Sequence, residues 1–92
     1  MIKTFKHQGL AELWEKDKTK RIDQRLHKRI KVRLDALNKA LRLEDLHVPG
    51  FDFHRLQGFT PARYSLHVNG PWCVTFEWKD GDAFRVDYEQ YH

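Results

Sequence analysis

His54, Tyr91 and His92 are the side chains of this sequence best suited to moving protons. Histidine titrates nearest neutrality and tyrosine is a weak acid, so together they could exchange protons with a reacting hydroxyl. Cleavage of an RNA phosphodiester needs such groups. The ribose 2′-hydroxyl attacks, one group removes its proton, another protonates the leaving oxygen, and a cation stabilises the phosphorane. That route requires no metal ion.

A structural role is the simpler alternative for each of these residues. A lone histidine in a basic protein is more often a surface residue than a catalytic one, and Tyr91 could pack its ring against a sheet edge. The six histidines show no close pairing and no HExxH motif, and there is a single cysteine, so a metal site is not expected. Glycine-rich nucleotide-binding motifs are also missing, so we expect no cofactor.

Positive charge is concentrated in the first half of the chain. Residues 1–43 contain 13 Lys and Arg against 5 Asp and Glu, whereas residues 44–92 contain 4 against 8. A basic surface attracts polyanions, so nucleic acid is the first partner to consider, and a solvated helix face is the alternative. The candidate phosphate-binding residues of this half include Lys20, Arg21, Arg25 and Lys28.

The length of 92 residues suits one domain with a single modest core, residues 1–92. No apolar run approaches the roughly 20 residues that span a bilayer, and the N-terminal segment lacks the apolar centre of a secretory signal. The lone Cys73 can form no internal disulfide, which is typical of a reducing compartment. We therefore expect a cytoplasmic protein with no membrane partner.

Hydrophobic spacing predicts a short strand at residues 1–5 and then two helices. The first helix, residues 8–16, places its apolar side chains on one side. The second, residues 22–41, has the clearest stripe, with apolar residues every three or four positions at Ile22, Leu26, Ile30, Leu34, Leu37 and Leu41. Pro49 and Gly50 follow and end the helical part.

Three strands joined by tight turns are predicted for residues 63–69, 72–78 and 83–88, with turns at "NGP" and "KDGD". The fold class is therefore α+β. The short N-terminal strand and the C-terminal meander form an antiparallel sheet, and two helices pack on one of its faces. Alternation along the strands places a set of mostly polar side chains on the opposite face, which we expect to be open: Ser65, His67, Cys73, Thr75 and Glu77.

The run from His54 to His92 resembles the HigB toxins of bacterial toxin-antitoxin modules, within the RelE superfamily. The residues that carry the resemblance are "LQG", "RYSLHVN", "WCVTF", the Gly-Asp turn and the closing Tyr-His. The segment "MIKTFKHQGL" and the two helices also fit, so the resemblance covers the whole length.

This resemblance implies a compact RelE-like fold and a ribosome-dependent endonuclease that cuts mRNA in the decoding site and arrests translation. It also implies neutralisation by a helix-turn-helix, HigA-like antitoxin, with operator DNA bound only through the antitoxin complex. His54 matches a histidine that lies by the scissile phosphate in some members, and Tyr91 and His92 match the closing Tyr-His. The basic helix would contact phosphates of ribosomal RNA.

Several positions depart from the family pattern. Gln90 stands where an acid is expected before Tyr-His, Gln57 where some members have a lysine, and His67 where an arginine is common. Cys73 replaces an arginine expected to hold the phosphate. A thiol lacks the permanent charge and paired donors of a guanidinium, and losing one such contact costs about 2.7–4 kcal/mol of transition-state stabilisation.

These departures leave several interpretations open. Arg55, Arg63 or His67 could supply the missing cation, or the toxin could be weakened, with Cys73 a natural or an attenuating substitution. A second interpretation is a catalytically impaired homologue that mainly binds its antitoxin and, through it, DNA. A third is a basic RNA-binding module with no chemistry.

Overall fold

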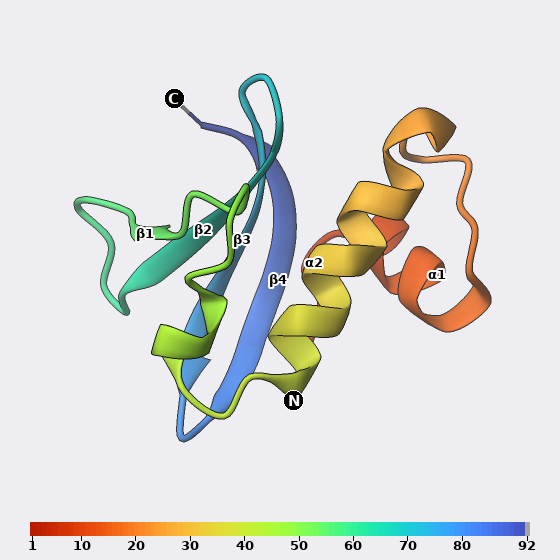
Figure 1. Cartoon of the computed structure of the whole chain (residues 1–92). Coiled ribbons are helices and arrows are strands. Elements are labelled where there is room, and N and C mark those ends of the chain that lie inside the picture. Colours follow the sequence, from red (N-terminus) through yellow and green to blue (C-terminus); the bar gives the residue numbers. More distant parts are fainter. Residues whose placement is uncertain (92) are drawn as a thin grey trace.

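The computed structural model describes residues 1–91 and shows a four-stranded antiparallel sheet with helices on one face (Figure 1). The strands are adjacent in chain order: β1 (His54–Arg55), β2 (Arg63–Asn69), β3 (Trp72–Lys79) and β4 (Asp82–Gln90). The helices are α1 (Gln8–Lys16) and α2 (His27–Lys39), with short 3-10 turns at Gln24–Leu26 and Leu43–Leu46. No helix among the described residues combines the length and the apolar character needed to cross a bilayer. The predicted α+β class is confirmed.

The meander forms where alternation and turn residues predict it. β2 has the predicted bounds, and β3 and β4 extend the predicted strands by one to three residues. Left-handed backbone at Asp80 (φ 53°) and Gly81 (φ 81°) makes the tight turn between β3 and β4. The antiparallel register pairs Leu66 with Val74 and Val74 with Tyr88, which aligns apolar side chains across the three strands.

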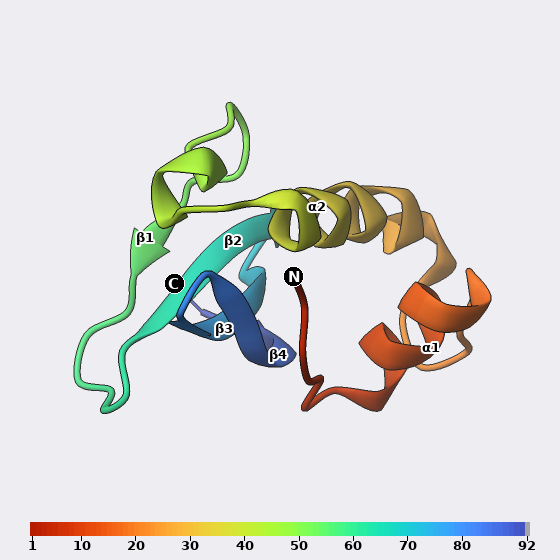
Figure 2. The same cartoon turned by 90° about the horizontal axis from the view of Figure 1, so that it is seen from below.

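The core lies between the sheet and α2, with α1 beside α2 near the β4 edge (Figure 2). From α2, Ile30, Leu34 and Leu37 are fully buried at helical spacing. The sheet buries Leu66, Val68, Val74, Phe76 and Val86 against them. Each such side chain contributes about 1.5–3 kcal/mol when it leaves water.

The first helix has the predicted bounds. His7 caps it, because its Nδ1 accepts a hydrogen bond from the backbone N–H of Leu10 at 3.3 Å. Asp17 ends it in the left-handed conformation at φ 69°. The helix buries Leu10 and Leu13 and presents Lys16 in its last turn.

The second helix is shorter than predicted at both ends. Ile22 is buried but lies before the helix, because the Asp23 carboxylate accepts from the backbone N–H of Arg25 and starts a 3-10 turn there. Ala40 is extended (ψ 131°), so the helix ends at Lys39, and Leu41 is 81% exposed instead of buried. The apolar stripe therefore includes residues on both flanks that are not helical.

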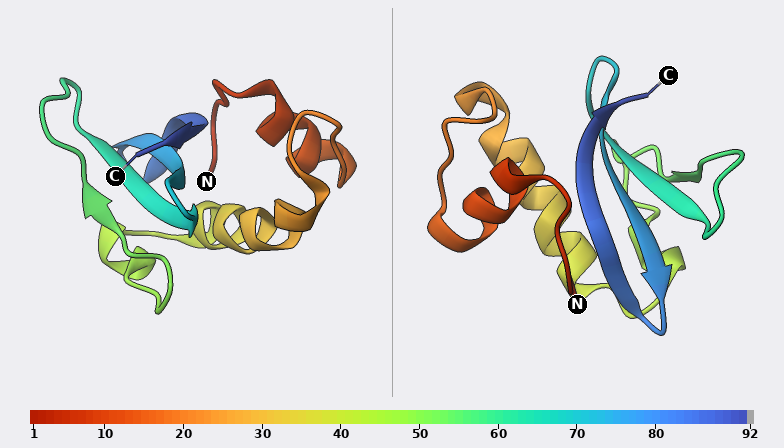
Figure 3. Two further views of the ribbon diagram at one scale, coloured as in Figure 1. Left: turned by 90° about the horizontal axis from the view of Figure 1, so that it is seen from above. Right: turned by 180° about the vertical axis from the view of Figure 1, so that it is seen from behind.

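The predicted N-terminal strand is reduced to two isolated parallel bridges, Ile2 to Ala83 and Phe5 to Val86. Figure 3 shows this segment running along β4 at the edge of the sheet. The fourth strand is instead β1, which pairs His54 with Ser65 and Arg55 with Tyr64.

The expectation of an open polar face was wrong. Ser65 and Thr75 are fully buried and Cys73 is 5% exposed, whereas His67 and Glu77 are partly exposed. Side chains of neighbouring residues cover this face: the His54 ring lies against Ser65, and Arg63 and Glu89 meet over Thr75. Sequence alternation identified the side of the sheet correctly but not its burial.

Candidate active site

A cavity of about 240 Å³ opens on this second face of the sheet. Four segments that are distant in sequence meet there: the β1 region, the end of β2, the start of β3 and the residue after β4. The lining residues are Asp52, His54, Leu56, His67, Gly70, Cys73 and Tyr91. The cavity therefore brings together His54, His67, Cys73 and Tyr91, which the sequence had placed in one candidate site, and His92 lies outside the described residues.

His54 is held in a defined ring orientation. Its Nδ1 lies 2.9 Å from the backbone oxygen of Asp52, and a carbonyl can only accept, so Nδ1 carries the proton. In the neutral ring Nε2 is then an acceptor. The Ser65 hydroxyl lies 3.4 Å from Nε2 and 3.5 Å from Nδ1, and these nearly equal distances place it against the ring instead of in line with one nitrogen. His54 is exposed, so a ligand can reach Nε2.

His67 is held in the same way by its own neighbours. Its Nε2 lies 3.0 Å from the Gly70 carbonyl, which assigns a proton to Nε2 and leaves Nδ1 as the acceptor of the neutral ring. Its backbone N–H donates to the carbonyl of Phe51 at 2.6 Å, which ties β2 to the loop before β1. The two histidines thus present opposite ring nitrogens as acceptors.

Tyr91 reaches the cavity from just beyond β4. Its backbone N–H donates to the Pro71 carbonyl at 2.6 Å, so the chain is still fastened to the β2–β3 turn after the last strand ends. Its ring meets Phe59 edge-on, with centroids 6.3 Å apart. These contacts place a weak acid beside two imidazoles, the combination that general acid-base catalysis uses.

A protein-family model described as a RelE-like toxin of the type II toxin-antitoxin system HigB matches residues 3–92. The chain belongs to the HigB-like toxin family. It is 37% identical over 92 residues to a protein named Endoribonuclease HigB from Proteus vulgaris, covering 100% of both chains. It is also 32% identical over 88 residues to Toxin HigB-1 of Vibrio cholerae, covering 94% of this chain and 93% of that protein. Membership of a type II toxin-antitoxin family implies an antitoxin partner.

Cys73 of this HigB-like toxin lines the cavity but brings no charge to it. Its Sγ lies 3.9 Å from the Pro71 carbonyl and the residue is 5% exposed. Burial, reinforced by the negative charges of Asp52 and Glu89, raises the pKa of the thiol above its ordinary value. The thiol is therefore neutral near pH 7 and cannot act as the arginine of the family pattern would.

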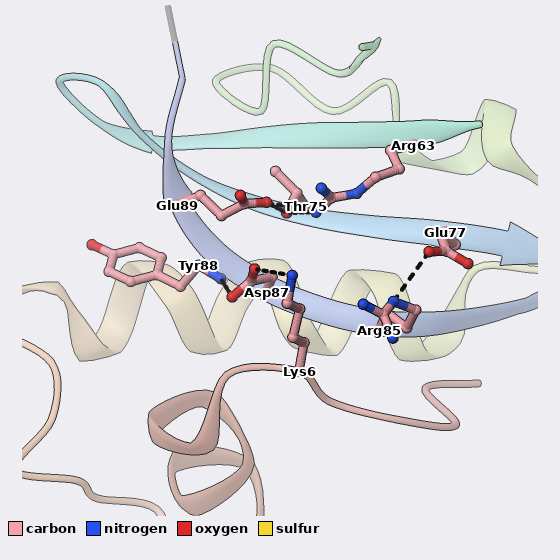
Figure 4. Close-up of polar contacts among 8 residues, drawn as sticks. All are labelled: Lys6, Arg63, Thr75, Glu77, Arg85, Asp87, Tyr88 and Glu89. Carbon is pink, nitrogen blue, oxygen red and sulfur yellow. Dashed lines mark hydrogen bonds and ion pairs between the residues drawn. The ribbon is translucent and has the colours of Figure 1, made fainter. Parts of the chain in front are cut away.

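Arg63, a candidate for the phosphate, is engaged inside the toxin instead (Figure 4). Its Nη2 donates to Thr75 Oγ1 at 2.6 Å and to Glu89 Oε2 at 2.5 Å, and its guanidinium carbon lies 5.1 Å from the centre of the Phe59 ring. The Thr75 hydroxyl donates to the same carboxylate oxygen. Burial alone would raise the pKa of Glu89, but the hydrogen bonds from Thr75 and Arg63 outweigh it and hold the pKa below its ordinary value.

Arg55 follows His54 on β1 and is exposed. Within residues 1–91 its side chain makes no hydrogen bond and no ion pair, whereas Arg63 makes both. Gln57 and Gln90 are exposed as well and introduce neither charge nor a titrating group. Arg55 is not among the residues that line the cavity, and because successive side chains of a strand point to opposite faces, it lies on the face of β1 opposite His54. Arg55 as the cation for the phosphate therefore stays a prediction.

The basic candidates of the first half lie elsewhere, at the end of the molecule formed by α1, α2 and the loop between them (Figures 1 and 2). A shallow groove of about 740 Å³ runs there, and its lining includes Lys20 and Lys28 with Lys16, Lys18 and Lys31. Arg21 pairs with Glu12 at 3.3 Å and Arg25 with Asp23 at 2.7 Å, so their charges are partly compensated. The groove and the cavity are separate surfaces.

Asp52 is the residue of the cavity that sequence reasoning missed. It lines the space, holds His54 through its carbonyl, and lies in the left-handed region at φ 44°, which is uncommon for a residue other than glycine. The sequence offers one signal only, its position two residues before His54. Among the described residues no three His, Cys, Asp or Glu side chains are arranged to hold a metal ion.

Proposed function

We propose that this HigB-like toxin is a ribosome-dependent endoribonuclease that cuts mRNA in the decoding site. The observation that carries the proposal is the cavity in which His54, His67 and Tyr91 converge, with the proton of His54 held on Nδ1 so that Nε2 is an acceptor. The name of the Proteus vulgaris relative supports the same reaction class. The ribosomal substrate places the activity in the cytoplasm.

The proposed transesterification uses residues of the cavity together with Arg55 and His92. His54 Nε2 accepts the proton of the ribose 2′-hydroxyl while that oxygen bonds to phosphorus. The bond from phosphorus to the 5′-oxygen breaks, and Tyr91 or His92 protonates the leaving oxygen. Arg55 and His67 are the candidates for offsetting the charge on the phosphorane, which neutral Cys73 cannot do. No step is assigned to a metal ion.

The lysine-lined groove supports a second element of the proposal, contact with ribosomal RNA. Lys20 and Lys28 are exposed in it and can neutralise phosphates without reading sequence. Such contacts would orient the toxin on the ribosome, and the cavity on the other side of the fold would then meet the message. Arg21 and Arg25 contribute less because each already pairs with an acid.

Ribosome dependence is tested by incubating the toxin with a defined mRNA, free or bound to programmed ribosomes, and mapping the new 5′ ends. We expect cuts within the decoding-site codon on ribosomes and an intact free message. Intact mRNA in both conditions would overturn the proposal, and equal cleavage of free mRNA would overturn ribosome dependence.

A second candidate function is favoured by the neutral thiol at Cys73 and by the engagement of Arg63 with Glu89. In that case the chain is an impaired homologue whose remaining function is binding an antitoxin and, through it, operator DNA. Stable co-purification with the antitoxin encoded beside it, together with intact ribosomal mRNA, would support this second candidate.

A further inference from the structure

Arg33 points into the fold although it belongs to the basic set of α2. Its side chain is half-buried, and its Nε donates to the His67 carbonyl at 2.7 Å. One terminal nitrogen donates to the Gly50 carbonyl at 3.3 Å and the other to the Arg29 carbonyl at 3.1 Å. The guanidinium carbon also lies 4.7 Å from the centre of the Phe51 ring.

These contacts use the whole planar fork of the guanidinium. They join three elements: α2 through Arg29, β2 through His67, and the loop before β1 through Gly50 and Phe51. The three donors of a lysine sit on a single nitrogen, so they cannot reach three carbonyls spread around a planar fork while that group stacks on a ring. The side chain is therefore committed to the interior and is not free to contact a polyanion.

Two of the residues that Arg33 contacts belong to or adjoin the wall of the cavity: His67 lines it, and Phe51 directly precedes the lining residue Asp52. The backbone N–H of His67 donates to the carbonyl of Phe51 at 2.6 Å. Arg33 contacts both residues, because it donates to the His67 carbonyl and stacks on the Phe51 ring. The next residue, Asp52, provides the carbonyl that fixes the proton of His54 on Nδ1. Arg33 thus contacts the backbone of His67 directly and is connected to the His54 ring through Phe51 and the carbonyl of the adjoining Asp52.

We propose that Arg33 is a positioning residue that sets the ring orientation and tautomer of His54 and the place of His67 in the cavity. It touches neither substrate nor reacting atoms. The catalytic part of this inference rests on the endoribonuclease activity proposed above. Because a displacement of about 1 Å can cost a hundredfold in rate, loosening this wall lowers turnover without weakening ribosome binding.

The test compares Arg33→Lys with Arg29→Gln, a matched change on the same helix that removes an exposed contact to Asn69. Three quantities are measured on each full-length variant: the ring nitrogen shifts of His54 and His67 by NMR, the thermal midpoint, and single-turnover cleavage on programmed ribosomes. For Arg33→Lys we expect a folded protein, loss of the Nδ1–H preference of His54, and cleavage slowed about tenfold to a hundredfold at unchanged ribosome affinity. Arg29→Gln should leave the tautomer and the rate unchanged.

The inference is overturned if the Arg33→Lys variant retains the Nδ1–H tautomer of His54 and the Nε2–H tautomer of His67. It is also overturned if cleavage by this variant falls only in proportion to its unfolded fraction. Should Arg33→Lys fail to fold, Phe51→Leu removes the stacked ring alone and is judged by the same outcomes. If the wild type itself cuts no mRNA, the proposed function fails, and the NMR comparison still decides whether Arg33 sets the tautomer of His54.

Discussion

Arg63 and Glu89 lie on the two strands that flank β3 and meet over Thr75, with Nη2 of the arginine 2.5 Å from Oε2 of the glutamate. Their side chains are 13% and 26% exposed, so the pair is largely removed from water. The pair provides hydrogen-bond partners for the buried Thr75 hydroxyl and covers this part of the second face of the sheet. We therefore assign Arg63 to stability, and Arg55 remains a predicted cation for the phosphate.

Substituting these two arginines should separate the roles. Arg63→Ala leaves Glu89 without its charged partner and should lower the free energy of unfolding by about 1–3 kcal/mol. Arg55→Ala should leave the unfolding midpoint unchanged and slow cleavage on programmed ribosomes by about a hundredfold, because a charged contact to the phosphorane is lost. Thermal melts and single-turnover rates measure the two effects. A destabilised Arg55→Ala with a normal rate would reverse the assignment.

The same pair makes stability depend on pH in the acid range. The pKa of Glu89 is lower in the folded protein than its ordinary value of 4.5, so the unfolded state binds its proton first as pH falls. The stabilisation is complete above the unfolded pKa and is lost as pH falls through the folded pKa. Glu89→Gln should therefore flatten the decline in unfolding free energy below about pH 4.5. Glu15→Gln, at an exposed carboxylate of α1, is the control and should leave the decline unchanged.

Cys73 offers a test of the missing phosphate ligand. Since its thiol is neutral and lines the cavity, Cys73→Arg adds a charge where the family pattern has one, and we expect cleavage to rise by about a hundredfold to a thousandfold. Cys73→Ser, which adds no charge, should leave the rate within a few-fold of the wild type. The raised pKa also predicts slow alkylation of Cys73 at pH 7 compared with a free thiol, measured by mass spectrometry. An unchanged rate for Cys73→Arg would show that another group already supplies the cation.

The groove lysines should act through salt-dependent binding alone. The double variant Lys20→Gln, Lys28→Gln removes two phosphate contacts, so the slope of log affinity for ribosomes against log salt should become shallower by about 1.4–1.8. Lys39→Gln changes an exposed lysine of α2 outside the groove and should leave the slope as in the wild type. Equal slopes for all three proteins would remove the groove from the ribosome contact.

Sequence patterns predicted the helices and strands better than they predicted the ends of the helices and the burial of individual residues. The meander followed from alternation and turn residues, and α1 from spacing, because those signals depend on neighbours in the chain. Ile22 and Leu41 fit the helical stripe, yet neither is helical and Leu41 is exposed, because cap geometry decides where a helix begins and ends.

The sequence selected four residues that line the cavity but did not predict their surroundings. His54, His67, Cys73 and Tyr91 were selected from residue type, alternation and family pattern, and the cavity unites them. Contacts between distant segments bury Thr75 beneath Arg63 and Glu89 and turn the Arg33 side chain inward. The role of the Asp52 carbonyl in orienting His54 was likewise not evident from the sequence. No spacing rule in a single sequence encodes such contacts.

If the cavity around His54 performs the cleavage, single-turnover cutting of mRNA on programmed ribosomes depends on the His54 imidazole. His54→Ala is compared with His47→Ala, an exposed histidine that does not line the cavity. We expect His54→Ala to bind ribosomes and melt like the wild type but to cut at least about a hundredfold more slowly, while His47→Ala cuts normally. Cleavage by His54→Ala at the wild-type rate and at the same nucleotides would contradict this role of the cavity.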